Sequence, residues 1–86
     1  MSFFVYMIIS KHNNKWISYV GYTNNIISRI TLHNSSKGAK FTRGKQWTLI
    51  YFKKYENKVD AMQNEYKLKK NYKLRRKIKL KFLKNE

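Results

Sequence analysis

The sequence of 86 residues contains no cysteine, so neither a disulfide bond nor a zinc–thiolate centre can hold the fold together. Any metal ion must therefore be bound by oxygen atoms or imidazole nitrogens. A long apolar segment is also missing. The longest apolar run, Phe3 to Ile9, is too short to span a bilayer, and no secretory signal pattern surrounds it. We therefore expect a cytoplasmic protein that is not secreted and binds no membrane, and that associates with the nucleoid if its source is bacterial.

Acidic residues are scarce as well. Twenty Lys and Arg residues stand against four Asp and Glu residues, which gives a formal net charge of +16. Residues 1–52 carry seven basic residues and no acid, and all four acids follow: Glu56, Asp60, Glu65 and Glu86. A surface of this charge attracts polyanions, so we expect a nucleic acid as the partner. The weaker alternative is a basic protein whose charge only reflects genome composition.

Two familiar catalytic arrangements are absent from the sequence. No Ser-His-Asp or Cys-His nucleophile set can be assembled, because there is no cysteine and the few acids lie elsewhere. The segment from Gly38 to Gly44 is not a P-loop, since Gln46 stands where that motif requires Ser or Thr. We interpret this segment as a basic flap over a phosphate backbone.

The pattern of apolar and polar residues predicts an α+β fold in a single domain, residues 1–86, with the element order β-β-α-β-α-α. The unbroken apolar run at residues 3–9 is typical of a central strand that is buried on both faces. Asn57 is the expected N-cap of the second helix, and Thr23, Asn24 or Asn25 caps the first. The expected strands are 3–9, 16–22 and 47–55, and the expected helices are 24–34, 58–70 and 73–84.

Residues 3–22 are expected to form a β-hairpin. A turn centred between His12 and Asn13 pairs residues whose numbers sum to 25, and this register sets Tyr6 opposite Tyr19. A slip of one residue would place the two rings on opposite faces of the sheet. We expect them on the same face. Gly21 stands where the chain must bend or where another group must approach closely.

The first expected helix has an apolar arc of Ile26, Ile27 and Ile30. Arg29 and His33 are four residues apart, so they lie side by side on one flank of that arc. From spacing alone, such a basic pair is more often a solvated edge or a phosphate contact than a catalytic pair.

Glu65 is the unusual residue of the second expected helix. It falls within the apolar arc of that helix, which contains Val59, Ala61, Met62, Tyr66 and Leu68. A carboxylate in such an arc is unfavourable unless it is paired or binds a metal ion. The spacing leaves two alternatives open: an ion pair with Lys69, four residues further on, or a metal ligand.

Two triplets, Phe4-Val5-Tyr6 and Tyr19-Val20-Gly21, resemble the signature triplets of the GIY-YIG nuclease domain. Further elements match in order: Gly21-x-Thr23, Arg29, His33, Gly38-Ala39-Lys40-Phe41-Thr42-Arg43, and Glu65 with Leu68-Lys69-Lys70. Each triplet alone is weak, whereas the ordered set, which covers about residues 2–80, is specific. The chain is most similar to the short stand-alone bacterial group, which resembles the nuclease domain of the Slx-type structure-specific endonucleases. Phe4 replaces the first glycine, and Phe41 stands where a tyrosine is expected.

The resemblance implies a three-stranded antiparallel sheet flanked by helices, and an endonuclease that uses a divalent metal to hydrolyse DNA phosphodiester bonds. Because no separate DNA-reading domain is visible in the sequence, we expect DNA structure to direct cleavage more than DNA sequence does. Glu65 would be the protein ligand of Mg²⁺ or Mn²⁺. Tyr6 would act as general base or orient the attacking water, and Tyr19 would orient the nucleophile or the phosphate. Arg29 would stabilise charge on the phosphate, and His33 would assist proton transfer or hold the phosphate.

Contacts to DNA are expected from five residues of the flap and the second helix: Lys40, Thr42, Arg43, Lys45 and Lys69. The first alternative function is a catalytically silent nucleic-acid-binding module of the same fold. The second is an interaction protein whose basic C-terminal helix, with the stripe Leu74, Ile78 and Phe82, binds a membrane surface or an acidic partner. We expect this stripe to cover the core instead. A partner subunit that supplies specificity, and the oligomeric state, stay open.

Overall fold

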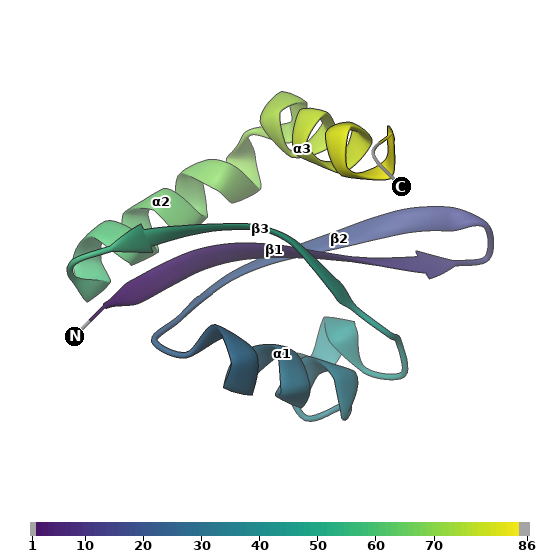
Figure 1. The fold of residues 1–86 in the computed structure, drawn as a ribbon, viewed down its shortest axis with the longest axis horizontal. Helices are drawn as coiled ribbons and strands as arrows, with labels where there is room; N and C mark the ends of the chain where they lie inside the picture. The colour runs from purple at the N-terminus through teal and green to yellow at the C-terminus, as the bar shows by residue number, and fades with distance from the viewer. Residues whose placement is uncertain (1, 85–86) are drawn as a thin grey trace.

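Three antiparallel strands in the order β2-β1-β3 organise the fold. A computed structural model describes residues 2–84, and the elements along the chain are β1 (Phe3–His12), β2 (Lys15–Thr23), α1 (Ile26–Asn34), a 3₁₀ turn (Lys40–Thr42), β3 (Thr48–Tyr55), α2 (Lys58–Lys70) and α3 (Tyr72–Lys84). Helix α1 covers one face of the sheet, and α2 and α3 lie over the other (Figure 1). The α+β class and the element order predicted from the sequence are confirmed. No helix within residues 2–84 is long and apolar enough to cross a bilayer.

β1 is the central strand because its side chains are apolar toward both faces of the sheet. Val5, Met7 and Ile9 face α2 and α3, and alternate residues Tyr6 and Ile8 face α1. All five residues are at most 2% exposed. This confirms the prediction of a central strand buried on both faces, and it gives the small domain two separate clusters of buried side chains.

A tight turn at Asn13 and Asn14 joins β1 to β2. Both residues have positive φ, 52° and 64°, which a type I′ hairpin turn requires and asparagine tolerates. The register pairs residues whose numbers sum to 27, so Tyr6 lies opposite Gly21. The predicted register, with Tyr6 opposite Tyr19, is wrong by two residues because the turn is centred between the two asparagines. Since the shift is an even number, Tyr6 and Tyr19 still share one face, as predicted.

α1 contacts the sheet along a narrow stripe. Asn25 is the N-cap, and its side chain accepts a hydrogen bond of 3.0 Å from a backbone N–H of the first turn. Ile26, Ile30 and His33 follow at the i, i+4, i+7 spacing of one helix face, and all three are at least partly buried. Ile27 lies about 100° away on the helix and is 81% exposed. The predicted apolar arc is therefore wrong at Ile27.

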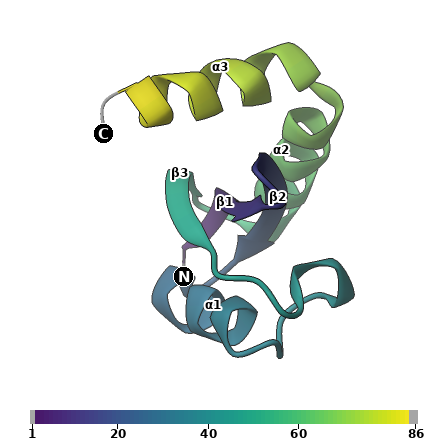
Figure 2. The ribbon, with the colours of Figure 1, turned by 90° about the vertical axis from the view of Figure 1, so that its right-hand side faces the viewer.

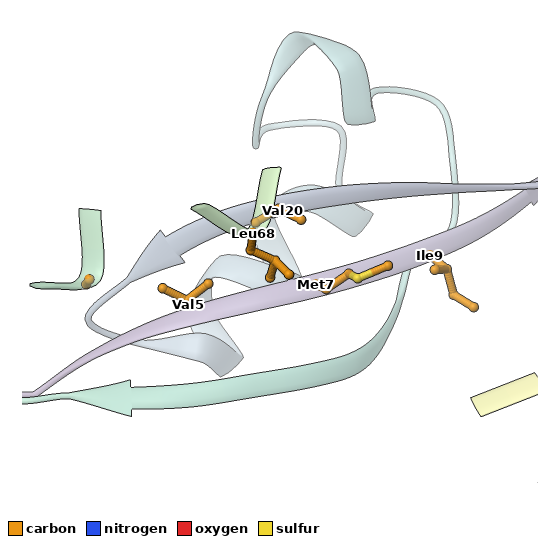
Figure 3. Packing of buried hydrophobic residues seen from close by; sticks show 6 residues of the cluster. Val5, Met7, Ile9, Val20 and Leu68 are labelled. Carbon is orange, nitrogen blue, oxygen red and sulfur yellow. The ribbon is translucent and has the colours of Figure 1, made fainter. Parts of the chain in front are cut away.

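α2 also contacts the sheet along one stripe, made of Ala61, Glu65 and Leu68 at the same i, i+4, i+7 spacing. Its bounds and its N-cap, Asn57, are as predicted, and Asn57 accepts a hydrogen bond of 2.8 Å from the backbone N–H of Asp60. Figure 3 shows Leu68 lying over β1, close to Val20 and between Val5 and Met7. The wider predicted arc is wrong, because three of its members are largely exposed: Val59, Met62 and Tyr66.

α3 crosses the sheet on the same side as α2, as a second view makes clear (Figure 2). Asn71 ends α2, and its side chain accepts a hydrogen bond of 3.1 Å from the backbone N–H of Leu74. Ile78 and Phe82 pack against the apolar cluster, as predicted for the stripe of this helix. Leu74 is 41% exposed and contributes less. The stripe of α3 therefore covers core residues in this structure.

Candidate active site

A tyrosine and a histidine meet on the α1 face of the sheet. The Tyr6 hydroxyl lies 2.7 Å from Nε2 of His33. Both residues are buried: Tyr6 is 1% exposed and His33 is fully covered. Tyr6 is brought there by β1 and His33 by the last turn of α1. The pair is thus fixed by two regular elements, with almost no contact with bulk water.

Thr42 determines which nitrogen of His33 carries the proton. The Thr42 hydroxyl donates a hydrogen bond of 2.8 Å to the carbonyl of Ala39. Because this uses its single proton, the hydroxyl must accept at its 2.8 Å contact with Nδ1 of His33. Nδ1 of His33 is therefore protonated. In the neutral ring Nε2 is then unprotonated, so it accepts the hydrogen bond from the Tyr6 hydroxyl.

Two glycines make room for this pair. A side chain at Gly21 would collide with the Tyr6 hydroxyl, and one at Gly38 would collide with the His33 ring. Neither position needs a special backbone conformation, since Gly44 is the glycine with positive φ. Gly21 and Gly38 therefore act by letting the Tyr6 and His33 rings lie directly against the backbone. The prediction that Gly21 permits a close approach is confirmed.

The loop after α1 is attached to the sheet by hydrogen bonds. The Asn34 side chain accepts a 2.6 Å hydrogen bond from the Trp47 backbone N–H and donates one of 3.2 Å to the Trp47 carbonyl. The Trp47 indole N–H donates a 2.9 Å hydrogen bond to the carbonyl of Thr42. Trp47 is 4% exposed. These bonds hold Thr42 against His33, although the two residues are nine positions apart in the sequence.

Arg29 brings a positive charge to the buried pair. Burial raises the pKa of Tyr6 above its ordinary value, and the nearby phenol of Tyr19 and carboxylate of Glu65 add to this rise. The Arg29 guanidinium, within hydrogen-bonding reach of the Tyr6 hydroxyl, opposes it. Burial, with a smaller contribution from Arg29, lowers the pKa of His33 below its ordinary value of 6.5. At neutral pH Tyr6 therefore keeps its proton and His33 can accept one.

Tyr19 leads from the buried pair toward the surface. Its ring centroid lies 5.1 Å from that of His33, and 6.2 Å from that of Phe41 in a nearly parallel arrangement. Tyr19 is partly buried, whereas Phe41 is 53% exposed. A row of rings thus runs from Tyr6 in the interior, through His33 and Tyr19, to Phe41 at the surface.

Glu65 lies on α2, which covers the face of the sheet opposite to α1, so the structure does not place it on the same face as the Tyr6–His33 pair. Its side chain is 19% exposed, and its carboxylate is near enough to contribute to the raised pKa of Tyr6. Its carboxylate forms an ion pair with Lys69, with 3.5 Å between Oε1 and Nζ. The first of the two sequence-based alternatives, the ion pair, is therefore present. No group of three or more His, Cys, Asp or Glu side chains that could hold a metal ion occurs in residues 2–84.

The surroundings of Glu65 fit a hydrated divalent ion. Glu65 lines an open hollow of about 500 Å³, whose other lining residues are Tyr22, Met62, Gln63, Tyr66 and Lys67; Tyr6, Tyr19, Arg29 and His33 are not among them. Mg²⁺ keeps several waters and often binds through a single carboxylate. One protein ligand in a roomy hollow therefore suits this ion, and a bound cation would compete with Lys69, whose ammonium pairs with Oε1, for the carboxylate.

The residues expected to contact DNA have different environments. Lys40 and Arg43 are exposed, and Lys45 is partly buried, with its ammonium 5.6 Å from the ring centroid of Phe41. Lys69 has 48% of its side chain exposed but is paired with Glu65. Thr42 is completely covered, and its hydroxyl is engaged by His33 and Ala39. Thr42 therefore belongs to the buried hydrogen-bond chain and not to the surface of the flap.

In this small basic α+β domain a strand tyrosine meets a helix histidine, an arginine lies near them, and the tyrosine is influenced by a carboxylate on the helix across the sheet; this set of groups suits an enzyme that acts on phosphate esters. The comparison with protein families makes this specific: the GIY-YIG catalytic domain matches residues 2–79. The chain belongs to the GIY-YIG family, a family of nucleases. The resemblance inferred from the ordered motifs is confirmed.

Several relatives share this sequence pattern. A UPF0213 protein of Oceanobacillus iheyensis is 50% identical over 52 residues, which cover 59% of this chain and 60% of that protein. A UPF0213 protein of Pediococcus acidilactici is 47% identical over 70 residues, which cover 78% of this chain and 68% of that protein. The match thus spans 60–68% of the length of these two relatives. The solution NMR structure of a UPF0213 protein of Bacillus halodurans is 38% identical and covers 98% of this chain and 86% of that chain, with a TM-score of 0.48.

Proposed function

We propose that this protein is a metal-dependent endonuclease that hydrolyses DNA phosphodiester bonds, directed by DNA structure more than by base sequence. The observation that carries the proposal is the hydrogen bond of 2.7 Å between the Tyr6 hydroxyl and Nε2 of His33, with Arg29 beside it. A buried, oriented phenol–imidazole pair next to a guanidinium can remove a proton from a water molecule while a neighbouring phosphate is neutralised.

In the proposed reaction, Tyr6 need not ionise before it acts. It takes a proton from the attacking water as it passes its own proton to Nε2 of His33. The imidazolium then donates from both nitrogens, to Tyr6 and to Thr42. This path agrees with the raised pKa of Tyr6 and the lowered pKa of His33, because the relay starts from a neutral phenol and a neutral imidazole. Since Tyr6 is 1% exposed, the water approaches from the side of Tyr19 and Arg29, which are both partly exposed.

The bond changes balance as a hydrolysis. The oxygen of the deprotonated water forms a bond to phosphorus, and one phosphorus–oxygen ester bond breaks. The leaving oxygen takes a proton from solvent, so the products are a phosphomonoester and an alcohol. Arg29 neutralises the charge that gathers on the phosphate oxygens, and Tyr19 orients the water or the phosphate. His33 finally returns its proton to solvent through Tyr6.

Glu65 is the proposed ligand of the divalent cation, Mg²⁺ or Mn²⁺. Such a cation, when bound, stabilises negative charge on the phosphate and orients the reacting groups. Lys69 then becomes free to contact a phosphate, because its partner carboxylate is occupied. The role of Lys69 as a DNA contact therefore follows from the role of Glu65 as a ligand.

Recognition by DNA structure is supported by the kind of basic side chain near the cluster. Lys40 and Arg43 are exposed beside it, and lysine and arginine on a loop contact phosphates regardless of sequence. Affinity for DNA should therefore depend steeply on salt and little on sequence.

The test is to incubate the purified protein with branched, nicked, single-stranded and fully paired DNA, with and without Mg²⁺ or Mn²⁺. We expect metal-dependent cleavage that differs between these structures. Cleavage should fall about 10²- to 10⁴-fold in Tyr6→Phe while DNA binding remains. Binding to all four substrates without cleavage at any metal concentration would instead identify a catalytically silent nucleic-acid-binding module.

A further inference from the structure

Phe41 presents an aromatic ring to solvent directly beside the candidate active site. It is 53% exposed, although phenylalanine is among the residues most often buried. Its neighbours are the ring of Tyr19 at 6.2 Å, nearly parallel, and the buried ring of Trp47 at 6.3 Å. The rings of Tyr19 and Trp47 therefore support Phe41 on the side that faces the protein. Phe41 lies on the solvent side of Tyr19, next to the proposed phosphate position.

The surroundings of Phe41 are positively charged. Lys40 and Arg43 are its close neighbours in the chain and are exposed. The Lys45 ammonium lies 5.6 Å from the Phe41 ring centroid. No acidic residue occurs before Glu56. An apolar ring amid lysine and arginine side chains combines a stacking surface with phosphate-binding groups, which is the combination that single-stranded nucleic acids require.

We propose that Phe41 and Tyr19 form an aromatic platform on which an unpaired base of the DNA stacks, next to the phosphate that is cleaved. The proposal rests on the proposed function for the position of that phosphate. In a continuous duplex, neighbouring bases cover both faces of each base, so a duplex interior offers the platform no ring. A base in a single strand, a flap or a gap has an open face. The platform would therefore favour cleavage beside unpaired nucleotides.

The chemistry of Phe41 also limits what the platform can read. A phenyl ring has no hydrogen-bonding group, so it binds the π-face of any base without reading the base edge. The platform therefore selects unpaired over paired nucleotides and discriminates little among the four bases. It adds a specificity-determining residue to a site whose other members act in the proposed hydrolysis: Tyr6, His33 and Arg29.

The first experiment measures the affinity of Phe41 variants without metal, for a short single strand and for a duplex of the same sequence. Base stacking on an aromatic side chain corresponds to about 5- to 150-fold in affinity. Phe41→Leu should lose affinity for the single strand in this range and change affinity for the duplex less than twofold. Phe41→Trp should keep both affinities. Equal losses for single strand and duplex in Phe41→Leu, or no loss for either, would overturn the proposal.

A second measurement locates the base. An abasic nucleotide is moved along the single strand, one position at a time. At one position the missing base should weaken binding to the wild-type protein but not to Phe41→Leu, as a double-mutant cycle requires for a direct contact. If base removal weakens both proteins equally at every position, Phe41 stacks no base.

Tyr72→Ala is the matched control. Tyr72 is 64% exposed and lies beneath a cation, Arg75, at 5.7 Å, but α3 places it on the opposite side of the sheet (Figure 2). Its removal should leave the ratio of single-strand to duplex affinity unchanged.

The outcomes of these experiments also separate the aromatic platform from the proposed nuclease function. Single-strand binding that depends on Phe41 in a protein without cleavage supports the platform and refutes the nuclease. Cleavage by a protein whose affinity for the single strand does not depend on Phe41 supports the nuclease and refutes the platform.

Discussion

The two faces of β1 differ in what they bury. Toward α2 and α3, the strand contributes Val5, Met7 and Ile9 to a cluster of purely apolar side chains. Toward α1, alternate residues bring Tyr6 into contact with His33, a fully buried polar ring. β1 therefore contributes only apolar side chains to one face and, one residue along, Tyr6 of the candidate active site to the other. Glu65 is the candidate site residue that comes from the α2 side.

The two faces are stabilised by different physics. Apolar side chains gain free energy in proportion to the area removed from water, so the α2 side tolerates changes that preserve volume and polarity. Buried polar groups are stable only when every donor and acceptor is matched. The α1 side meets this condition through a chain from Tyr6 through His33 and Thr42 to the carbonyl of Ala39. Damage to that chain should affect chemistry first, and damage to the apolar cluster should affect stability first.

The largest expected effect belongs to Glu65, on the stripe that α2 lays against the sheet. Glu65→Gln keeps the shape but removes the charge that would bind Mg²⁺. Since a metal ion stabilises a phosphoryl transition state by roughly several kcal/mol, cleavage should fall by orders of magnitude. DNA affinity should be equal or higher, because a negative charge near the phosphates is lost. The test is to measure the cleavage rate, the DNA affinity and the melting temperature of Glu65→Gln.

Glu56→Gln is the control for this change, since Glu56 is exposed in the turn before α2. It should cleave like the wild type. If Glu65 serves only as the partner of Lys69, Glu65→Gln should lower the melting temperature modestly and cleave normally. Normal cleavage in a well-folded Glu65→Gln protein would remove Glu65 from the site.

The next prediction compares the loss of a tyrosine hydroxyl group on each of the two faces of the sheet. Tyr6→Phe deletes the hydroxyl that contacts His33, and general acid–base catalysis is worth about 10²- to 10⁴-fold in rate. Tyr51→Phe deletes a hydroxyl on the opposite face, where Tyr51 packs against the apolar cluster. We expect a loss of cleavage in this range for Tyr6→Phe and a change of less than threefold for Tyr51→Phe, in single-turnover assays. Similar rates in the two variants would refute the relay.

The sequence predicted the sheet and helices well because local signals and packing agree in them. The unbroken apolar run of β1 identified the central strand, and Asn57 capped α2 as expected. The hairpin register was wrong, since both Asn13 and its neighbour can take positive φ and the pattern does not say which pair makes the turn. The helix arcs were too wide, because a helix on a narrow sheet touches it along one stripe, which leaves Ile27 exposed.

The site was only partly predictable for a related reason. Tyr6 and Tyr19 share a face by strand parity, and Arg29 and His33 are neighbours by helical spacing, so their grouping follows from periodicity and the resemblance. Thr42 sits in a 3₁₀ turn between glycines, where no periodicity tells which side chain points inward. That Thr42 points inward and Phe41 points to solvent is therefore known only from the folded loop.

On the apolar face, the expected effect is on stability. Met7 is fully buried in the cluster, and Met→Ala changes in cores cost about 2–5 kcal/mol. Met7→Ala should lower the free energy of unfolding by this amount, as measured by urea denaturation. At a temperature where the variant is folded, its cleavage rate should match the wild type. The exposed Leu80→Ala should change stability by less than about 0.5 kcal/mol. A Met7→Ala protein that is stable but inactive would contradict the division of labour between the faces.

The smallest expected effect is the pH dependence of stability that His33 contributes. Burial, and to a lesser degree Arg29, lowers the pKa of His33 in the folded protein. The unfolded chain therefore binds a proton at this histidine at a higher pH than the folded chain does. The contribution of His33 to the free energy of unfolding is fully present above its pKa in the unfolded chain, near 6.5. It decreases as the pH falls from there toward the pKa of His33 in the folded protein, with a slope of at most about 1.4 kcal/mol per pH unit for one proton.

Urea denaturation between pH 5 and pH 8 measures this slope, and the composition makes it easy to see. The chain has four acids and two histidines, so few other groups titrate in the window. His12 lies exposed next to the hairpin turn, and His12→Gln should retain the slope. His33→Gln should remove most of it, and its lower overall stability does not affect the comparison, because only the slope counts. If His33→Gln keeps the slope and His12→Gln loses it, then His33 is not held neutral by the fold, and the relay from Tyr6 loses its proton acceptor.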